Sequence, residues 1–360
     1  MNITKISLTN FRNFHRLSVD FDSKGCLIFG KNGVGKSNLL EAITYFSLGK
    51  SVRNSPDEDI ISFEKDSLTS QATFVDSDSS NNLDFGLFIG HKAKKLIKFN
   101  GKVLDKISRL YSLVRIVYFS SFDIFLIQGA PSLRRGFLDR QISQISQEYL
   151  HCLIAYKKVL AQRNRLLKIG YAPFEKKLWD EQFASAIVPV LKHRFLYIRE
   201  FNKQIKTLCP KLSSKPICLK YKCSCKTTKK EKLRESIFRQ LEQIKKDEKY
   251  FQRSLIGPHL DDIVFLFDGK SAKDFASFGQ KKLALITSKI NHAHLLQNKI
   301  NQTPILIFDD ILSELDVKNR THILKVAKGE MQLFIASPTR QEYLNELNFQ
   351  KIDLEKKKVS

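Results

Sequence analysis

A glycine-rich octapeptide near the start of the chain constrains the fold more than any other feature. Residues 30–37 read Gly-Lys-Asn-Gly-Val-Gly-Lys-Ser and match the phosphate-binding pattern G-x-x-x-x-G-K-S/T in full. Such a loop binds phosphate because its glycines let backbone N–H groups converge on the phosphate oxygens, while the following helix N-terminus adds partial positive charge. The apolar run at 26–29 indicates a buried strand before the loop, and an apolar stripe from Leu39 to Phe46 indicates a helix after it. The sequence therefore predicts an α/β fold that binds a nucleotide.

Two side chains of the octapeptide have specific tasks in ATP binding. Lys36 is expected to reach the β- and γ-phosphates as a point charge, and the Ser37 hydroxyl to complete the shell of Mg²⁺. A tight glycine turn without a ligand is the structural alternative. The expected ATP-binding residues of the loop are Gly30, Lys31, Asn32, Gly33, Val34, Gly35, Lys36 and Ser37.

A second motif lies far along the chain. Residues 305–310 read Ile-Leu-Ile-Phe-Asp-Asp, four apolar positions that end in two acids, which is the form of a Walker B strand. Asp309 is expected to hold Mg²⁺, and Asp310 to act as the catalytic base that polarises the attacking water. The side chain of Asp310 is one methylene shorter than a glutamate, so we expect a poorly placed base and slow hydrolysis. A capped turn is the structural alternative, but the upstream phosphate loop favours the functional interpretation.

Two further short motifs complete an ordered set. Ser277-Phe278-Gly279-Gln280 resembles the signature motif of ABC-type ATPases, at the start of a helix expected near 280–298. Ser313–Asp316, after the Walker B strand, resembles a D-loop. In such heads the signature serine of one subunit meets the γ-phosphate held by the other, so Ser277 is expected to act in trans within an ATP-dependent homodimer. A plain helix N-cap is the structural alternative for Ser277.

With these motifs in order, the chain resembles the RecF family of bacterial replication and recombination-repair ATPases, which belongs to the SMC-like ABC group. The resemblance covers almost the whole length. Two positions depart from the pattern, because Val52 stands where the family usually has His and Leu260 where it usually has Arg. The resemblance rests further on residues 8–14, 49–53, 122–139 and 257–262, and Asp123 lies in a weakened copy of a family motif.

The resemblance implies an ABC-type P-loop ATPase head, a mixed β-sheet with flanking helices, plus an inserted helical arm lobe. Strand-like alternation occupies the N-terminal part of the chain and returns from Gly257, while a helical period begins at Pro131. The expected domains are therefore a split head, 1–105 and 256–360, and an arm lobe, 106–255. The 273 residues from Lys36 to Asp309 are too few for the coiled coil of a full SMC protein and too many for a transporter ATPase.

The function that the resemblance implies is an ATP-dependent DNA-binding dimer. RecF-like proteins bind duplex DNA and single-strand/double-strand junctions, and they work with RecO and RecR to load RecA onto gapped DNA in replication, recombinational repair and the SOS response. The implied enzyme is a weak DNA-dependent ATPase whose slow hydrolysis resets the dimer. By the same resemblance Arg12 and Asn13 would lie near the phosphates and Arg53 near the nucleotide, with sheet-edge hydrogen bonding or a solvated charge as the open alternative.

The positive charge of the chain is concentrated in one segment. The sequence holds 61 Lys and Arg against 37 Asp and Glu, a formal net charge of +24. Residues 203–253 alone contain 16 basic and 5 acidic residues, which favours a DNA-binding face with contacts mainly to phosphate. Lys229, Lys230 and Lys232 are the candidate DNA-binding residues. A solvated Lys-rich helix face remains the alternative.

Several other residues allow two interpretations. Arg134 and Arg135 begin a helix where the helix dipole would favour acids, which suggests a bound anion or acidic partner, or else pairing with Asp139 or Glu148. His259 is expected to be a structural turn residue. The six cysteines favour reduced thiols over a zinc site, although Cys218, Cys223 and Cys225 form a cluster.

Other classes of protein fit the sequence less well. No apolar run approaches the roughly 18–20 residues of a membrane span, and the chain begins on a patterned strand without a leader, so we expect a cytoplasmic protein with no membrane partner. A nuclease fused to a similar head is disfavoured, because the 44 residues after Asp316 hold no cluster of acids suited to two-metal chemistry. A nucleotide-binding adaptor that acts only through protein partners remains open, and DNA binding would separate it from the main interpretation.

Overall fold

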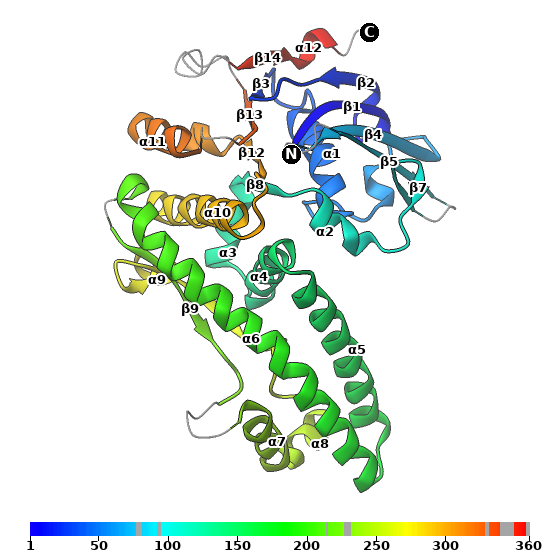
Figure 1. The fold of residues 1–360 in the computed structure, drawn as a ribbon, viewed down its shortest axis with the longest axis vertical. Coiled ribbons are helices and arrows are strands. Elements are labelled where there is room, and N and C mark those ends of the chain that lie inside the picture. The colour runs from blue at the N-terminus through cyan, green and yellow to red at the C-terminus, as the bar shows by residue number, and fades with distance from the viewer. Residues whose placement is uncertain are drawn as a thin grey trace. The chain divides into compact units, whose positions relative to one another are not determined.

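The computed structural model describes residues 1–76, 81–91, 95–213, 215–226, 232–327, 331–338 and 349–357. The chain divides into two compact units. Met1–Asp123 and Lys289–Ser360 form the first, here called the head unit, and Ile124–Ser288 form the second, the arm unit. Figure 1 shows the order of the elements along the chain.

The boundaries between the two units do not coincide with the domain boundaries expected from the sequence. In the head unit, β8 (Ile116–Ser120) pairs in parallel with β12 (Ile305–Asp309), which brings the segment before residue 124 into the head. In the arm unit, β10 (Asp262–Phe267) pairs antiparallel with β9 (Ile217–Lys222), which brings residues 256–288 into the arm. Strand pairing between segments distant in sequence therefore sets both divisions.

Two sheets form the framework of the head unit. The first is antiparallel, with six strands in the order β2-β1-β4-β5-β6-β7, and the second is parallel, with five strands in the order β14-β3-β13-β12-β8. Strands β12 and β13 are buried at every position, which explains why all their residues except the last, Asp309 and Ser337, are apolar. The remaining strands of the head unit are β1 (Asn2–Phe11), β2 (Phe14–Asp20), β3 (Gly25–Phe29), β4 (Ser67–Val75), β5 (Asn82–Gly90), β6 (Leu96–Phe99), β7 (Lys102–Val103), β13 (Leu333–Ser337) and β14 (Gln350–Asp353).

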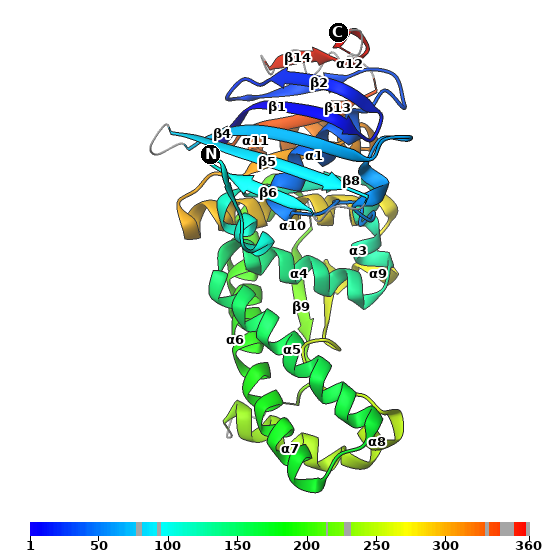
Figure 2. The ribbon, with the colours of Figure 1, turned by 90° about the vertical axis from the view of Figure 1, so that its right-hand side faces the viewer.

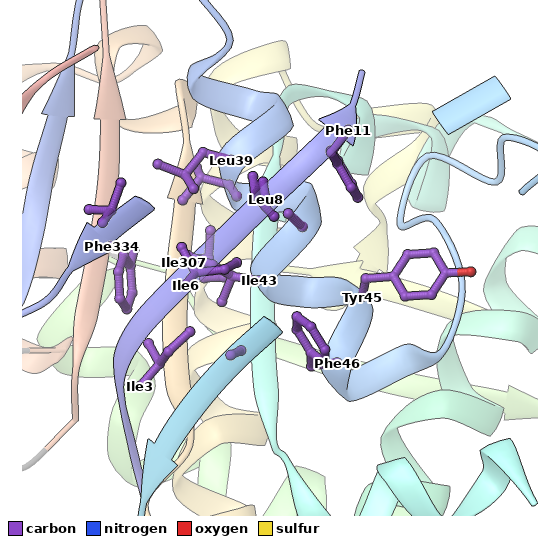
Figure 3. Close-up of a cluster of buried hydrophobic side chains, with 14 of the residues drawn as sticks. Ile3, Ile6, Leu8, Phe11, Leu39, Ile43, Tyr45, Phe46, Ile307 and Phe334 are labelled. Carbon is purple, nitrogen blue, oxygen red and sulfur yellow. The ribbon is translucent and has the colours of Figure 1, made fainter. Parts of the chain in front are cut away.

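Helix α1 (Lys36–Leu48) packs against both sheets and is buried almost all round (Figures 2 and 3). Ile6 and Leu8 of β1 reach the core from the antiparallel sheet, and Ile307 of β12 reaches it from the parallel sheet. A bulge between Ile3 and Lys5 shifts the register of β1 against β4, so Ile3 and Ile6 both enter this core. Because α1 is held from two sides, the glycine loop at its start is held as well. The other helical segments of the head unit are η1 (Glu58–Ile60), η2 (Ile107–Arg109), α2 (Leu110–Leu113), η4 (Ile311–Glu314), α11 (Val317–Ala327) and α12 (Leu354–Lys357).

The arm unit is mainly helical, with one small antiparallel sheet in the order β11-β10-β9. Its longest helix, α6 (Pro173–Leu212), packs along α5 (Gln147–Ile169). None of the helices in the described part of the chain combines the length and the apolar character that a membrane span requires. Two elements cross the division between the units, η3 (Ser121–Ile124) and α10 (Phe278–Ile300). The other elements of the arm unit are α3 (Phe125–Gln128), α4 (Pro131–Ile145), α7 (Leu233–Gln243), α8 (Lys245–Phe251), α9 (Ala272–Phe275) and β11 (Lys270–Ser271).

One buried amide joins the two sheets of the head unit. The Gln332 side chain accepts a hydrogen bond from the Ile3 backbone N–H at 2.8 Å and donates to the carbonyl oxygens of Ile3 and Asp22, each at 2.8 Å. Gln332 precedes β13 of the parallel sheet, whereas Ile3 lies in β1 of the antiparallel sheet. The buried amide thus satisfies both backbone groups of Ile3 in the core, and the carbonyl oxygen of Asp22 where the chain is part-buried.

We predict that Gln332→Leu destabilises the head unit by roughly 2–4 kcal/mol, because the variant leaves these backbone groups buried without their partner. Thermal unfolding of the purified chain, followed by calorimetry, measures the loss. Gln350→Leu is the matched control, since Gln350 makes similar bonds to Asp22 and Asp20 at a partly exposed position. Equal losses from the two substitutions would contradict the prediction.

Candidate nucleotide-binding site

The glycine loop connects β3 of the parallel sheet to α1. Gly30, Gly33 and Gly35 have φ values of 147°, 82° and 111°, a region that side chains with a Cβ rarely adopt. At Gly35 an added Cβ would also stand 2.7 Å from the Phe14 ring and 2.8 Å from the Asn13 side-chain oxygen. The loop conformation therefore depends on glycine, as the phosphate-binding pattern requires.

Lys36 is buried and folds back across the loop. Its Nζ donates to the carbonyl oxygen of Gly30 at 2.8 Å and to that of Lys31 at 3.2 Å. The ammonium group is thus fixed inside the curve of the loop, where phosphate oxygens could take the place of these acceptors.

The Walker B carboxylate lies against the start of α1. The Ser37 hydroxyl donates to Asp309 Oδ1 at 2.7 Å, and the Tyr118 hydroxyl donates to Asp309 Oδ2 at 2.5 Å. Burial, and next the charge of Asp309, raise the pKa of Tyr118 well above its ordinary value, so the phenol stays protonated and donates. A hydroxyl and a carboxylate from two distant segments thus present oxygen atoms side by side, and oxygen donors are those that Mg²⁺ prefers.

Asp310 follows the end of β12 at a sharp turn. Its backbone is left-handed, with φ 55°, and it precedes the short helix η4. The roles assigned to Asp309 and Asp310 from the sequence remain predictions.

Asn13 contacts the glycine loop directly. Its Nδ2 donates to the Val34 carbonyl oxygen at 3.1 Å, while its Oδ1 accepts from Asn38 of α1 at 2.9 Å. Arg53 donates in turn to Asn38 Oδ1 at 3.1 Å. The three side chains form a polar chain along the loop and the first turns of α1, and the expected place of Asn13 and Arg53 near the nucleotide remains a prediction.

Arg12 pairs with Glu41, an acid that was not predicted from the sequence. Its guanidinium makes two bonds of 3.0 Å to the two carboxylate oxygens of Glu41, which is fully buried in α1. Ser51 also donates to Glu41, and Arg12 further donates to the Asp59 carbonyl oxygen at 2.8 Å. This ion pair fastens the β1–β2 turn to α1, and a role of Arg12 toward phosphate remains a prediction. A lone acid inside an apolar helix stripe was the available signal for Glu41.

Lys289 of α10 fixes the end of β8 next to Asp309. Its Nζ donates to the Tyr118 carbonyl oxygen at 2.6 Å and lies 2.5 Å from Asp123 Oδ2. The same carboxylate oxygen accepts the Ser120 backbone N–H at 2.8 Å. Sequence reasoning missed Tyr118 and Lys289, because neither stands in a recognisable motif.

The signature segment belongs to the arm unit and caps α10. Ser277 Oγ accepts the Gln280 N–H at 3.3 Å, and Gln280 Oε1 accepts the Ser277 N–H at 2.9 Å, a reciprocal capping box. All four residues 277–280 are exposed. The N-cap interpretation therefore describes the local geometry, while the exposed position leaves Ser277 accessible to another subunit.

The D-loop segment and the candidate DNA-binding lysines are only partly described. Asp316 caps α11 by accepting the Asn319 N–H at 2.8 Å. Lys229 and Lys230 lie outside the described residues. Lys232 is exposed, and its Nζ lies 4.0 Å from Glu235, an ion pair that solvent screens strongly.

Arg134 has another partner than the acids considered from the sequence. Its guanidinium binds both carboxylate oxygens of Asp262, at 2.7 and 3.0 Å, and Arg135 donates to the Asp261 carbonyl oxygen at 3.0 Å. The sequence left pairing with Asp139 or Glu148 open as one of two alternatives, and for Arg134 that alternative is wrong, because α4 packs on β10 and brings Asp262 closer.

The segment 257–262 forms a buried polar centre of the arm unit. Arg194 of α6 donates to Asp139 at 2.8 Å and to the Pro258 carbonyl oxygen at 2.8 Å, and it pairs with Asp261 at 3.3 Å. His259 Nδ1 lies 2.5 Å from the Tyr156 hydroxyl, and its Nε2 lies 3.2 Å from the Ser254 carbonyl oxygen. Burial lowers the pKa of His259. One ring nitrogen thus contacts α5, and the other contacts the backbone just before the turn.

The cysteines form no disulfide, since all six are free. Within the described ranges, no three His, Cys, Asp or Glu side chains gather in a group that could hold a metal ion.

The chain is similar to proteins of known name. Residues 2–360 match the family described as RecF/RecN/SMC N terminal domain. The DNA replication and repair protein RecF of Halalkalibacterium halodurans is 32% identical over 346 residues, 94% of this chain and 92% of that protein. The RecF protein of Bacillus cereus is 32% identical over 347 residues, again 94% of this chain and 92% of that protein.

Solved structures give the same picture. The recombination mediator protein RecF in the RecFOR pathway, with ATP, is 28% identical, has a TM-score of 0.88, and covers 95% of this chain and 93% of that chain. A Pyrococcus furiosus Smc head domain is 17% identical with a TM-score of 0.54, over 94% of this chain and 90% of that chain, and shows likeness of fold alone.

We predict that Tyr118→Phe weakens Mg²⁺-dependent ATP binding by about tenfold, because Asp309 loses the donor that orients its carboxylate. Titration of labelled ATP at a series of Mg²⁺ concentrations measures the change. Tyr45→Phe is the matched control, since Tyr45 is a buried tyrosine of α1 that donates to Asp57 at 2.6 Å, away from the loop. Unchanged Mg²⁺ dependence in Tyr118→Phe would contradict the prediction.

Proposed function

Because the chain belongs to the RecF family of SMC-like ABC ATPases, we propose that it is an ATP-switched DNA-binding protein of replication and recombinational repair. One observation carries the proposal beyond family membership. The Ser37 hydroxyl and the Asp309 carboxylate, 272 residues apart, lie 2.7 Å from each other at the mouth of the glycine loop. That arrangement is what ATP with Mg²⁺ needs from two separate motifs.

The residues around the loop divide the work of holding ATP. The loop N–H groups and the first turn of α1 would bind the phosphates, and Lys36 would neutralise the β- and γ-phosphate charge. Ser37 and Asp309 would hold Mg²⁺, which when bound supplies further charge neutralisation at the phosphates. Asn13 would keep the loop in shape through its bond to the Val34 carbonyl.

Hydrolysis would reset the switch. Asp310 would polarise the attacking water, and its short side chain would make this step slow, at less than about one event per second. Ser277 would complete the site in trans, because the exposed capping box at the start of α10 can meet the γ-phosphate held by another subunit. ATP would thus favour the homodimer, and loss of the γ-phosphate would release it.

DNA binding would follow dimerisation. The net charge of +24 supports phosphate contacts with little dependence on base sequence. Lys229, Lys230 and Lys232 remain the first candidates. The preferred targets would be duplex DNA and gaps with a single-strand/double-strand junction in the cytoplasm. The partners would be RecO and RecR, and the outcome loading of RecA and support of the SOS response.

We predict that ATP with Mg²⁺ tightens binding to a labelled gapped duplex, and that Lys36→Ala abolishes this gain. Fluorescence anisotropy at fixed salt measures both, with Lys24→Ala as a control that removes an exposed lysine before β3. The gain should survive in Lys24→Ala. DNA binding that is the same with and without ATP, and the same in Lys36→Ala, would contradict the proposal of an ATP switch. No binding to DNA would favour an adaptor that acts through protein partners.

We further predict that substitutions of the two neighbouring acids affect different steps. Asp309→Asn should weaken Mg²⁺-dependent ATP binding at least tenfold, because it removes a metal-binding charge. Asp310→Asn should keep ATP binding while lowering the single-turnover rate about a hundredfold, because it removes the base. Quenched-flow measurements with a filter-binding assay distinguish the two. A wild-type rate well above one per second would contradict slow hydrolysis.

A further inference from the structure

Two aromatic rings stand exposed at the end of α8 in the arm unit. Residues 249–253, here called the 249–253 segment, form the last turn of α8 and the two residues after it; they read Lys-Tyr-Phe-Gln-Arg, and all five are exposed. Tyr250 is 81% exposed and Phe251 is 54% exposed, and their ring centroids lie 5.0 Å apart at an angle of 88°. Neighbouring large rings are usually removed from water, so a pair left at the surface marks a contact site.

Buried side chains hold this exposed segment at both of its ends. Glu248, just before it, is fully buried and binds both terminal nitrogens of Arg163, at 2.9 and 2.5 Å. Ser254, just after it, accepts from Arg163 at 2.7 Å and donates to Asn164 at 2.8 Å. One arginine of α5 therefore holds the residues on both sides of the 249–253 segment, and the two rings project from the last turn of α8.

The side chains that hold this segment form a buried network of charges, which contributes little to the free energy of unfolding. Arg163 also binds Asp180 of α6 at 2.6 Å, and Lys176 pairs with the same carboxylate. These four charged side chains are all buried, and the desolvation of such groups offsets most of their attraction. Apolar side chains in these places would pack α5, α6 and α8 equally well. What the charged network adds is therefore a defined position for the residues that it binds.

The charges around the rings indicate the chemistry of the ligand. Lys245, Lys246, Lys249 and Arg253 are all exposed within nine residues of chain, and Asp247 is the one exposed acid among residues 245–253. Cationic side chains bind phosphates, and exposed aromatic rings stack on flat unsaturated groups. A single-stranded nucleic acid offers both together, whereas the bases of a duplex are already stacked on each other.

We propose that the 249–253 segment, with Lys245 and Lys246, is a binding site for single-stranded DNA in which Tyr250 and Phe251 stack on unpaired bases. This inference rests on the proposed function, that the chain binds DNA, and it names a surface for the single-stranded side of a gap. The lysines and Arg253 contact phosphates, and the rings distinguish an open strand from a duplex.

The test compares two probes on one variant. Tyr250→Ala/Phe251→Ala should weaken binding to a labelled oligothymidylate by about tenfold or more, while affinity for a labelled duplex of the same length and for ATP stays unchanged. Phe63→Ala is the matched control, because Phe63 is an aromatic residue of the head unit that is 88% exposed. Lys245→Gln/Lys246→Gln should lower affinity for both probes and flatten the salt dependence.

A conservative variant supplies a direct readout. Tyr250→Trp should keep its affinity for oligothymidylate, and its added emission should be quenched by that probe and not by the duplex. The inference is overturned, and the proposed function stands, if the double alanine variant binds oligothymidylate as the wild type does. The same holds if the only binding that this variant loses is that of a protein partner. Failure of the wild type to bind either probe would overturn both proposals.

Discussion

The hydrogen bond between Ser37 and Asp309 is the contact on which the nucleotide site depends. It joins the first turn of α1 to the end of β12, and both positions follow from the parallel sheet. β3 and β12 are separated in that sheet only by β13, and all three strands run in the same direction. Their carboxyl ends therefore meet at one edge, where α/β folds place their ligands. A change in register of one strand would separate the hydroxyl from the carboxylate.

The sequence was sufficient for the residues that belong to contiguous motifs. The glycine loop and the apolar run before Asp309 are patterns that backbone chemistry imposes, so both could be predicted with their neighbouring strand or helix. Tyr118 and Lys289 could not, because each is defined only by what the fold brings beside it. Arg134 illustrates the same limit, since its acid partner, Asp262, comes from a strand far along the chain that packs on α4. Domain boundaries were set by strand pairing and differ from those expected from changes in period.

An arginine paired with an acid holds a turn in place in each unit, and it is half-buried in the head unit and buried in the arm unit. Arg12 binds Glu41 and holds a turn of the head unit on α1, while Arg194 binds Asp139 and collects the turn at 257–262. In each case the guanidinium also donates to a backbone carbonyl oxygen of a loop, which an apolar side chain could not satisfy. These pairs therefore contribute position more than stability, because desolvation offsets their attraction. The basic composition of the chain thus has an internal use in addition to any contact with phosphate.

Helix α10 contributes residues to both units. Ser277 caps its start in the arm unit, and Lys289, roughly three turns later, holds the carbonyl oxygen of Tyr118 in the head unit. The hydroxyl of that same tyrosine donates to Asp309. Lys289 thus positions the Tyr118 backbone, and through the Tyr118 hydroxyl this contact extends to the Asp309 carboxylate, although neither Tyr118 nor Lys289 stands in a motif.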